Sequence, residues 1–185
     1  MSVFKTKGVI LKKLNILEKD MVYDIFTYDF WRIKARKKPK VREKTLDVWY
    51  IVNFEIETQE WRDIHKIKNI KIISEFPYQG KDFAIIHEYL ALLNTIIIHI
   101  PHGIDVKEIF WIIEAVNEKK HINVLKLNLA RLKVLDIVWI LDCEHSDKQI
   151  RVILDFIQKN RISEILKLKS DSWDISDAIQ RLSRN

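Results

Sequence analysis

The spacing of the hydrophobic residues changes once along the chain, near residue 80. Before that point apolar and polar residues alternate, as in a β-strand that buries one face. After it, apolar residues recur every three or four positions, as in an amphipathic α-helix. A turn signal, Pro-Tyr-Gln-Gly at residues 77–80, marks the change. The sequence therefore predicts an α+β chain with two domains, residues 1–77 and residues 82–185.

Strand patterns fill the first domain. They cover residues 6–14, 21–28, 31–36, 48–56 and 66–75. In the third pattern Trp31, Ile33 and Ala35 alternate with basic residues, and the fourth is rich in β-branched and aromatic types. About five short strands in roughly 75 residues is the number expected for a small closed barrel such as an OB-fold. An open sheet with exposed edges is the alternative.

Helix patterns fill the second domain, which we expect to be an all-α helical bundle. Their predicted starts are Asp82, Asp105, Asn123, Ser146 with Asp147, and Asp171 or Ser172. The third pattern, residues 123–141, is the longest and most apolar and is therefore expected to be central. The buried face predicted for the first helix is Phe83, Ile86, Leu90, Leu93 and Ile97. For the second and fourth helices it is Ile109, Ile112, Ile113 and Val116, and Ile150, Ile153, Leu154 and Ile157.

The net charge of +6 is concentrated in one segment. Residues 1–80 hold 17 basic and 11 acidic side chains, and the rest of the chain is neutral. Most of the excess belongs to the third strand and the link after it, where only Glu43 opposes the basic residues. These are Arg32, Lys34, Arg36, Lys37, Lys38, Lys40, Arg42 and Lys44. A local basic cluster attracts polyanions, although a charge run is also typical of a solvated loop.

This basic segment predicts a DNA-binding surface. We expect Arg32, Lys34 and Arg36 to grip phosphates from the barrel face, and the cations from Lys37 to Lys44 to form a flexible phosphate-binding loop. Nearby aromatic residues either offer stacking surfaces for bases or fill the barrel. They are Tyr23, Tyr28, Phe30, Trp49 and Trp61. Because no recognition helix is apparent, binding should be insensitive to base sequence.

Catalytic and metal-binding patterns are weak. The three glycines are isolated, so no glycine-rich phosphate loop is present. Glu55 and Glu57 share one strand face, but a solvated sheet rim explains them without acid/base catalysis. A structural zinc ion takes four ligands, whereas the candidates here are scattered. They are His99, His102, Cys143 and His145. We therefore expect no enzymatic activity, no metal and no cofactor.

Three features favour a cytoplasmic location. The longest stretch without charge, between Glu88 and Asp105, is shorter and more polar than a membrane span. The first residues lack the apolar run of a secretory signal. The lone cysteine, Cys143, fits a reducing compartment. We expect a cytoplasmic protein without a membrane partner, associated with the nucleoid through DNA.

Three short motifs open the chain in a distinctive order. They are Thr-Lys-Gly-Val-Ile-Leu at residues 6–11, Glu-Lys-Asp-Met-Val at residues 18–22, and Ile-Phe-Thr at residues 25–27. In order and spacing they resemble the opening of the RecO family of recombination mediators. Tyr89-Leu90 and residues 127–142 are similar to the central helices of that family.

The resemblance implies an OB-fold followed by a helical domain that binds single- and double-stranded DNA and anneals complementary strands. It also implies contact with the C-terminal tail of single-stranded-DNA-binding protein, and partnership with RecR in loading the RecA recombinase. The chain departs from the family in three ways. Asp29-Phe30 stands where a turn glycine is usual, Cys143 is the only cysteine of the family's zinc cluster, and the helical region is shortened. The implied function is a metal-free, non-enzymatic mediator of DNA repair.

Two further hypotheses stay open. In the central helix pattern, Arg131 and Lys133 lie close to Leu129 and Leu132, so a basic rim beside an apolar pocket would dock an acidic peptide. The alternative is the solvated face of an amphipathic helix. An RNA-binding or translation-associated OB-fold protein would show the same charge and aromatic pattern, so the sequence leaves the choice between DNA and RNA open.

Overall fold

The computed structural model describes residues 2–17, 20–38, 46–58, 63–101, 107–140 and 148–168. The chain divides into two compact units. The first comprises Met1–Phe76 with Ile100–Phe110, and the second comprises Pro77–His99 with Trp111–Asn185. The first unit thus includes a segment, Ile100–Phe110, that the sequence analysis assigned to the helical domain.

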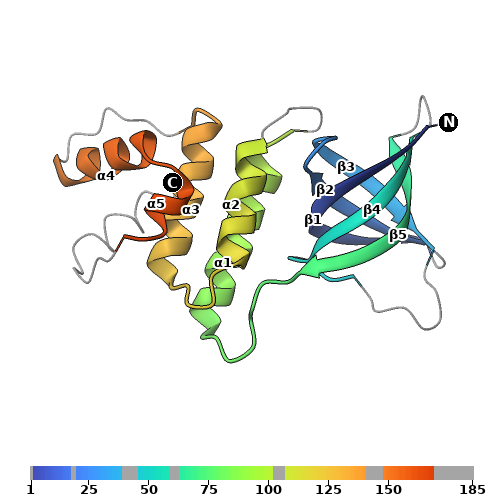
Figure 1. Cartoon of the computed structure of the whole chain (residues 1–185), viewed down its shortest axis with the longest axis horizontal. Helices are drawn as coiled ribbons and strands as arrows, with labels where there is room; N and C mark the ends of the chain where they lie inside the picture. The colour runs from blue at the N-terminus through green and yellow to red at the C-terminus, as the bar shows by residue number, and fades with distance from the viewer. Residues whose placement is uncertain are drawn as a thin grey trace. The chain divides into compact units, whose positions relative to one another are not determined.

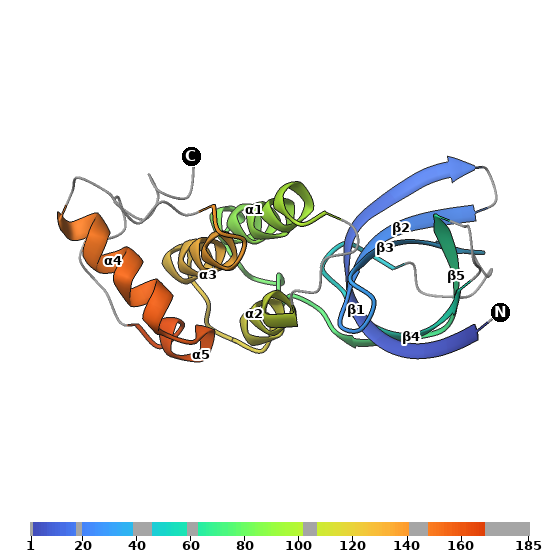
Figure 2. The ribbon, with the colours of Figure 1, turned by 90° about the horizontal axis from the view of Figure 1, so that it is seen from above.

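Five strands form a closed sheet in the first unit (Figure 1). They are β1 (Ser2–Leu17), β2 (Asp20–Thr27), β3 (Arg32–Lys37), β4 (Ile51–Thr58) and β5 (Ile64–Ser74). Their order is β1-β2-β3-β5-β4, and β4 pairs with β1 to close the sheet, which curls round on itself in Figure 2. Neighbouring strands are antiparallel except β3 and β5, which are parallel. All five predicted strands are confirmed.

The interior of the closed sheet is filled by the apolar residues of the alternating patterns. In β3 the inward residues Ile33 and Ala35 are buried, while Lys34 and Arg36 are exposed, as the alternation predicts. Fully burying a side chain of the size of Ile33 stabilises a fold by about 1.5–3 kcal/mol. Gly8 in β1 is required by close packing, because a Cβ there would lie 2.7 Å from Ile25 Cγ2 and 3.0 Å from the Phe26 carbonyl oxygen.

The second unit is built from helices, and one of these helices begins within the last residues of the first unit. They are α1 (Phe83–His99), α2 (Lys107–Asn117), α3 (Val124–Ile137), α4 (Lys148–Lys159) and α5 (Ile162–Ile165). The α+β class is therefore confirmed. Within the described part of the chain, no helix combines the length and the hydropathy needed to cross a bilayer.

Helix α3 is the central helix of the second unit, as predicted, but the reason given for it is wrong, because α1 is longer, with 17 residues against 14, and more apolar. It packs against α1, α4 and α5, and it is buried on nearly all sides. The helix begins after Asn123, whose side-chain oxygen accepts a hydrogen bond from the Lys126 N–H at 3.0 Å. It ends with Trp139 in the left-handed region, at φ 59°, while the Ile140 N–H donates back to the Leu135 carbonyl.

The buried faces predicted for α2 and α4 are confirmed, whereas of the face predicted for α1 only Leu93 is fully buried. Phe83 is 78% exposed, while Tyr89, Leu92 and Ile96 are buried. Apolar residues of α1 occupy most sides of the helix. Several apolar stripes therefore have the helical period, and packing determines which of them is buried. Helix α5, which has only 4 residues, was not predicted because it is too short to show a period. The predicted caps at residues 105 and 146–147 and the predicted final helix lie outside the described residues.

Candidate nucleic-acid interface

The outer face of β3 presents two cations to solvent. Lys34 and Arg36 are both exposed, and each lies on the side of the strand opposite the buried Ile33 and Ala35. Among the residues that the structure describes, neither cation has a hydrogen-bond or ion-pair partner. Two uncompensated charges on adjacent outward positions of one strand are suited to a ligand with regularly spaced negative charges.

Strand β5 extends this cationic surface. The parallel register places Lys66 beside Arg36, and Lys68 follows two residues later. Lys66 and Lys68 both form ion pairs with the Glu57 carboxylate, at 3.2 Å for Lys66, and their side chains remain 49% and 45% exposed. One buried carboxylate thus neutralises only part of the charge of two lysines. We call this surface the β3–β5 basic face, and its residues are Lys34, Arg36, Lys66 and Lys68.

The contribution of β5 was missed in the sequence. Its signal was present, because Lys66 and Lys68 alternate with Ile67 in the fifth strand pattern. Alternation places two lysines on one face of a strand, but it does not say which strand lies beside them. The neighbour is fixed by the closure of the sheet through the parallel pair of β3 and β5.

Arg32 does not belong to this face, which corrects the sequence prediction. Its guanidinium donates two hydrogen bonds from Nε and Nη2 to the Asp24 carboxylate, at 2.9 and 2.6 Å, and a third to the Ile100 carbonyl at 3.1 Å. The side chains of Arg32 and Asp24 are 12% and 4% exposed. Arg32 therefore ties β3 to β2 and to Ile100–Phe110, and its donors are occupied within the first unit.

The basic link after β3 is described only at its start. Lys37 is half-buried as the last residue of β3, and Lys38 is exposed directly after it. The other predicted phosphate-binding cations of the link, Lys40, Arg42 and Lys44, lie outside the described residues. The proposed flexible loop thus stays a prediction.

The aromatic residues proposed as stacking surfaces are mostly used in packing. Tyr23 is buried in the interior of the sheet, and Phe30 and Trp49 pack against that interior. Tyr28 meets the edge of the Phe110 ring, with a centroid distance of 5.7 Å, and Lys7 and Lys107 lie over the Tyr28 ring. Trp61 lies outside the described residues.

Trp31 is exposed instead, although the alternation predicts that it packs inward. It precedes β3 in the β2–β3 loop with φ 63°, and 42% of it is exposed. Thr27 fixes this conformation, because its hydroxyl donates to the Trp31 carbonyl at 2.8 Å and accepts from the Phe30 N–H at 2.8 Å. Thr6 supports the same loop by donating to Asp29 Oδ2 at 2.7 Å. The loop therefore holds the indole out of the core.

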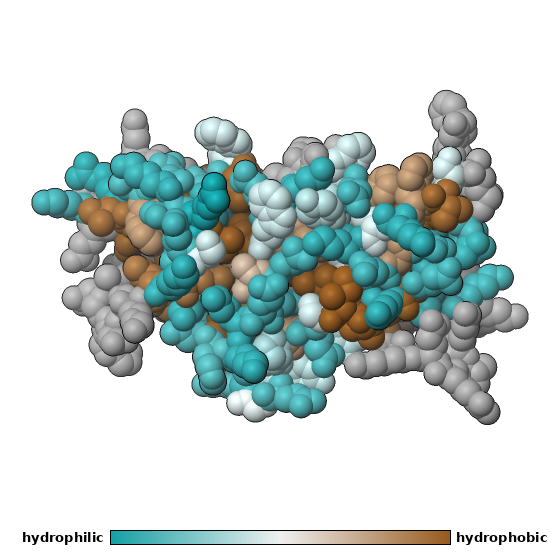
Figure 3. Space-filling view, viewed as in Figure 1, coloured by the Kyte–Doolittle hydropathy of each residue, from teal (hydrophilic) through white to brown (hydrophobic). Residues whose placement is uncertain are grey.

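A pocket opens beside Trp31 at the end of the sheet where β3 and β5 begin. Its volume is about 530 Å³, and its walls come from the β2–β3 loop, β3, the end of β4 and residues 63 and 65. Lys34 lines the pocket, so the pocket and the β3–β5 basic face are contiguous. Over the closed sheet, hydrophobic patches lie among hydrophilic side chains in the space-filling view of Figure 3.

No protein-family model matches this chain, and no curated protein matches it.

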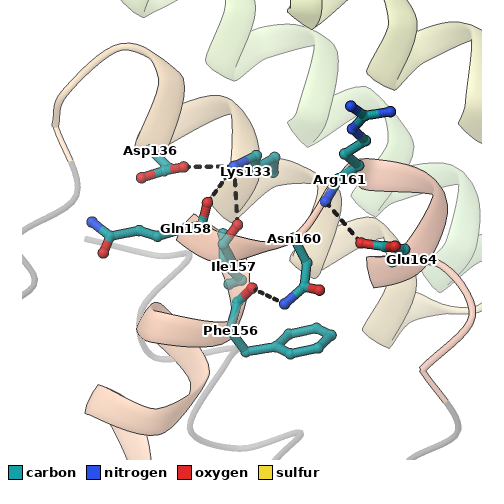
Figure 4. Close-up of polar contacts among 8 residues, drawn as sticks. All are labelled: Lys133, Asp136, Phe156, Ile157, Gln158, Asn160, Arg161 and Glu164. Atoms are coloured by element: carbon teal, nitrogen blue, oxygen red, sulfur yellow. Dashed lines mark hydrogen bonds and ion pairs between the residues drawn. The ribbon is translucent and has the colours of Figure 1, made fainter.

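The residues predicted to dock a peptide are occupied inside the helical unit. Leu129 and Leu132 are 1% and 0% exposed, in the core formed with α4 and α5. Figure 4 shows the Lys133 ammonium directed at Asp136 and at the carbonyls of Ile157 and Gln158, at 2.9, 2.9 and 3.4 Å. Lys133 therefore joins α3 to the C-terminal end of α4, where an ammonium complements the unpaired carbonyls.

Arg131 makes internal contacts as well. Its Nε donates to the Thr95 hydroxyl at 2.9 Å. Partial burial lowers the pKa of the Arg131 guanidinium, and the nearby Glu88 opposes that shift. Because both leucines are buried and both cations have partners, these four residues do not form the exposed basic and apolar site that the docking hypothesis requires.

The carboxylates and histidines reveal no metal site in the described ranges, where no three His, Cys, Asp or Glu side chains cluster. Glu57 is buried against Lys66 and Lys68, and Glu55 accepts a hydrogen bond from Asn69 at 2.7 Å. Their positions therefore fit a structural role in pairing β4 with β5. His102, Cys143 and His145 lie outside the described residues.

Proposed function

We propose that the closed sheet is an OB-fold barrel. The strand order β1-β2-β3-β5-β4 supports this assignment, together with closure through one parallel pair between β3 and β5. In OB-folds the face around the second and third strands, with the adjoining loops, binds oligonucleotides and oligosaccharides. Lys34 and Arg36 of β3 lie on that part of the sheet, and Lys66 lies beside Arg36 on the neighbouring strand β5.

On this barrel we propose a binding surface for single-stranded nucleic acid, without catalysis. The observation that carries the proposal is the uncompensated pair Lys34 and Arg36 beside Lys66 on β5. Lysine and arginine side chains contact phosphates, and neutralising a phosphate releases its condensed counterions. This chemistry favours a nucleic acid over a neutral oligosaccharide.

The fuller proposal is a RecO-like mediator that binds single- and double-stranded DNA and anneals complementary strands. It rests on the resemblance at residues 6–11, 18–22 and 25–27. The structure gives several of these residues packing roles. Gly8 allows close strand packing, while Thr6 and Thr27 hold the β2–β3 loop. The resemblance therefore supports a shared barrel, and the partnerships with single-stranded-DNA-binding protein and RecR rest on it alone.

A strand-annealing assay tests the mediator proposal. We expect the protein to accelerate annealing of complementary DNA strands coated with a single-strand-binding protein, because a basic surface screens the repulsion between them. Replacing Lys37, Lys38 and Lys40 with Glu should abolish annealing while far-ultraviolet circular dichroism stays unchanged. Failure of the unmodified protein to accelerate annealing would reject the mediator role.

A competition experiment separates DNA from RNA. Labelled single-stranded DNA bound to the protein is challenged with unlabelled DNA or RNA of equal length and base order. The mediator proposal predicts that DNA competes at least as well as RNA. Stronger competition by RNA would favour the RNA-binding alternative on the same barrel.

A further inference from the structure

The pocket beside Trp31 has the size and lining of a ligand site. Its volume of about 530 Å³ falls within the range of about 300–1,000 Å³ typical of small-molecule pockets. Phe30, Ile33 and Ile56 give it apolar walls, and His65 and Asp63 add polar groups. Such a combination suits a flat, partly apolar ligand with a hydrogen-bonding edge.

His65 is the group that most needs a ligand. It pairs in register with the buried Ala35, so it lies on the inner side of β5 where the pocket enters the sheet. Its Nδ1 is buried, and no residue that the structure describes hydrogen-bonds to it. Buried polar atoms are normally hydrogen-bonded, and an imidazole nitrogen either donates or accepts according to its tautomer. Because Nδ1 is buried while the residue lines the pocket, a ligand edge that offers donors and acceptors reaches it once the imidazole turns toward the ligand.

Trp31 provides a flat surface at the rim of this pocket. A bulky residue with φ 63° is strained, and such conformations persist where the surrounding structure enforces them. Here Thr27 enforces it through the hydroxyl contact with the Trp31 carbonyl and through its own N–H, which donates to the same carbonyl at 2.7 Å. The indole stays 42% exposed, and aromatic rings of this kind stack on nucleobases.

The charges around the pocket define which way a nucleotide would lie. Lys34 lines it, is exposed, and has no partner among the described residues, while Arg36 continues the cationic row away from the pocket. Arg32 also lines the pocket, but its guanidinium is paired with Asp24. Of the described lining residues Asp63 is the acidic one, and it would repel a phosphate. A phosphate is therefore favoured on the Lys34 side and a base on the side of Trp31 and His65.

We infer that this pocket takes one unstacked nucleobase of a bound single strand, with Trp31 stacking on the base, His65 hydrogen-bonding its edge, and Lys34 contacting its phosphate. The inference rests on the proposed function, since it adds a base subsite to a phosphate-binding surface. The same chemistry recognises a free nucleotide, which the test below distinguishes.

The test compares intact thymidine oligonucleotides with fully abasic strands of the same length and charge, bound to the full chain. Base–aromatic stacking predicts that the intact strand binds about 5- to 150-fold more tightly. The variants Trp31→Ala and His65→Ala should reduce this ratio while leaving the affinity for the abasic strand unchanged. Lys159→Ala, on α4, is a surface control and should leave the ratio unchanged. If His65→Ala fails to fold, His65→Phe removes the ring nitrogens while keeping the volume.

Each outcome has a defined meaning. Equal affinity for intact and abasic strands would overturn the base pocket but not the phosphate-binding surface. The same holds if the variants weaken the binding of both strands equally. Binding of neither strand would overturn the proposed function and the pocket with it. Thymidine monophosphate should compete only at concentrations far above those of the strand. Competition as strong as that of the strand would assign the pocket to free nucleotides and overturn the inference.

Discussion

Arg32 and Lys34 are outward residues of the same strand, two positions apart, but their surroundings give them different roles. Arg32 is held by Asp24 and the Ile100 carbonyl, whereas Lys34 is exposed without a partner among the described residues. The Asp24 side chain is only 4% exposed, so its charge depends on the guanidinium for compensation. We therefore assign Arg32 to stability and Lys34 to binding.

This assignment predicts that two alanine substitutions differ in their effect on the free energy of unfolding. Arg32→Ala leaves a buried carboxylate uncompensated and should lower the free energy of unfolding by about 3 kcal/mol. Lys34→Ala should change it by no more than about 0.5 kcal/mol. Urea denaturation measures both. Adding Asp24→Asn to Arg32→Ala should restore part of the loss, because the buried charge is removed. Equal stability of Arg32→Ala and the unmodified protein would contradict the role of Arg32.

Among the elements, α1 and α2 are joined by a buried polar contact. The Tyr89 hydroxyl donates to Asn117 Oδ1 at 2.8 Å, and Tyr89 is fully buried. Burial raises the pKa of Tyr89 well above its ordinary value of 10.0, and the hydrogen bond to Asn117 opposes that shift. The phenol therefore stays protonated in the folded chain at pH values where it ionises in the unfolded chain.

This shift predicts a loss of stability at high pH. Below pH 10 both states hold the Tyr89 proton, so its contribution is fully present. Above pH 10 the unfolded state releases the proton while the folded state keeps it, and stability falls by up to about 1.4 kcal/mol per pH unit. Because other tyrosines and lysines titrate there too, the measurement is the difference between the unmodified protein and Tyr89→Phe in urea denaturation at pH 9 to 11. Equal pH dependence of the two proteins would contradict this role of Tyr89.

The predictability of the elements followed the strength of their local signals. Strand patterns located all five strands, two of them through alternation, and Asn123 marked the start of α3 as its cap. The buried stripe of α1 was mispredicted because a helix that is apolar on most sides fits several stripes. Trp31 was mispredicted because its orientation depends on Thr27 and on a positive φ, which alternation does not encode.

The candidate site was predicted in part for the same reason. The exposed positions of Lys34 and Arg36 follow from the alternation within β3. The partners of Arg32 and the position of Lys66 depend on residues distant in the sequence, namely Ile100 and the parallel strand β5. Contacts of this kind form between segments that are distant in the sequence, so a local sequence pattern does not predict them.

For the whole molecule, the net charge of +6 becomes meaningful through its distribution. Most of the excess lies in the unit that contains the closed sheet, and part of it forms the β3–β5 basic face. The helical unit keeps its predicted docking cations in internal contacts. Binding of nucleic acid through phosphates on the closed sheet is thus the central claim.

The salt dependence of single-strand binding tests that claim most directly. A labelled thymidine oligonucleotide is titrated with the full chain at several salt concentrations. Contact with about five phosphates predicts a slope of about −3.5 for log affinity against log salt, and the Lys34→Ala/Arg36→Ala double variant should make it shallower by about 1.4. The double variant Lys148→Ala/Lys159→Ala on α4 removes the same net charge and should keep the original slope. A salt-independent affinity, or an unchanged slope in the Lys34/Arg36 variant, would contradict the account.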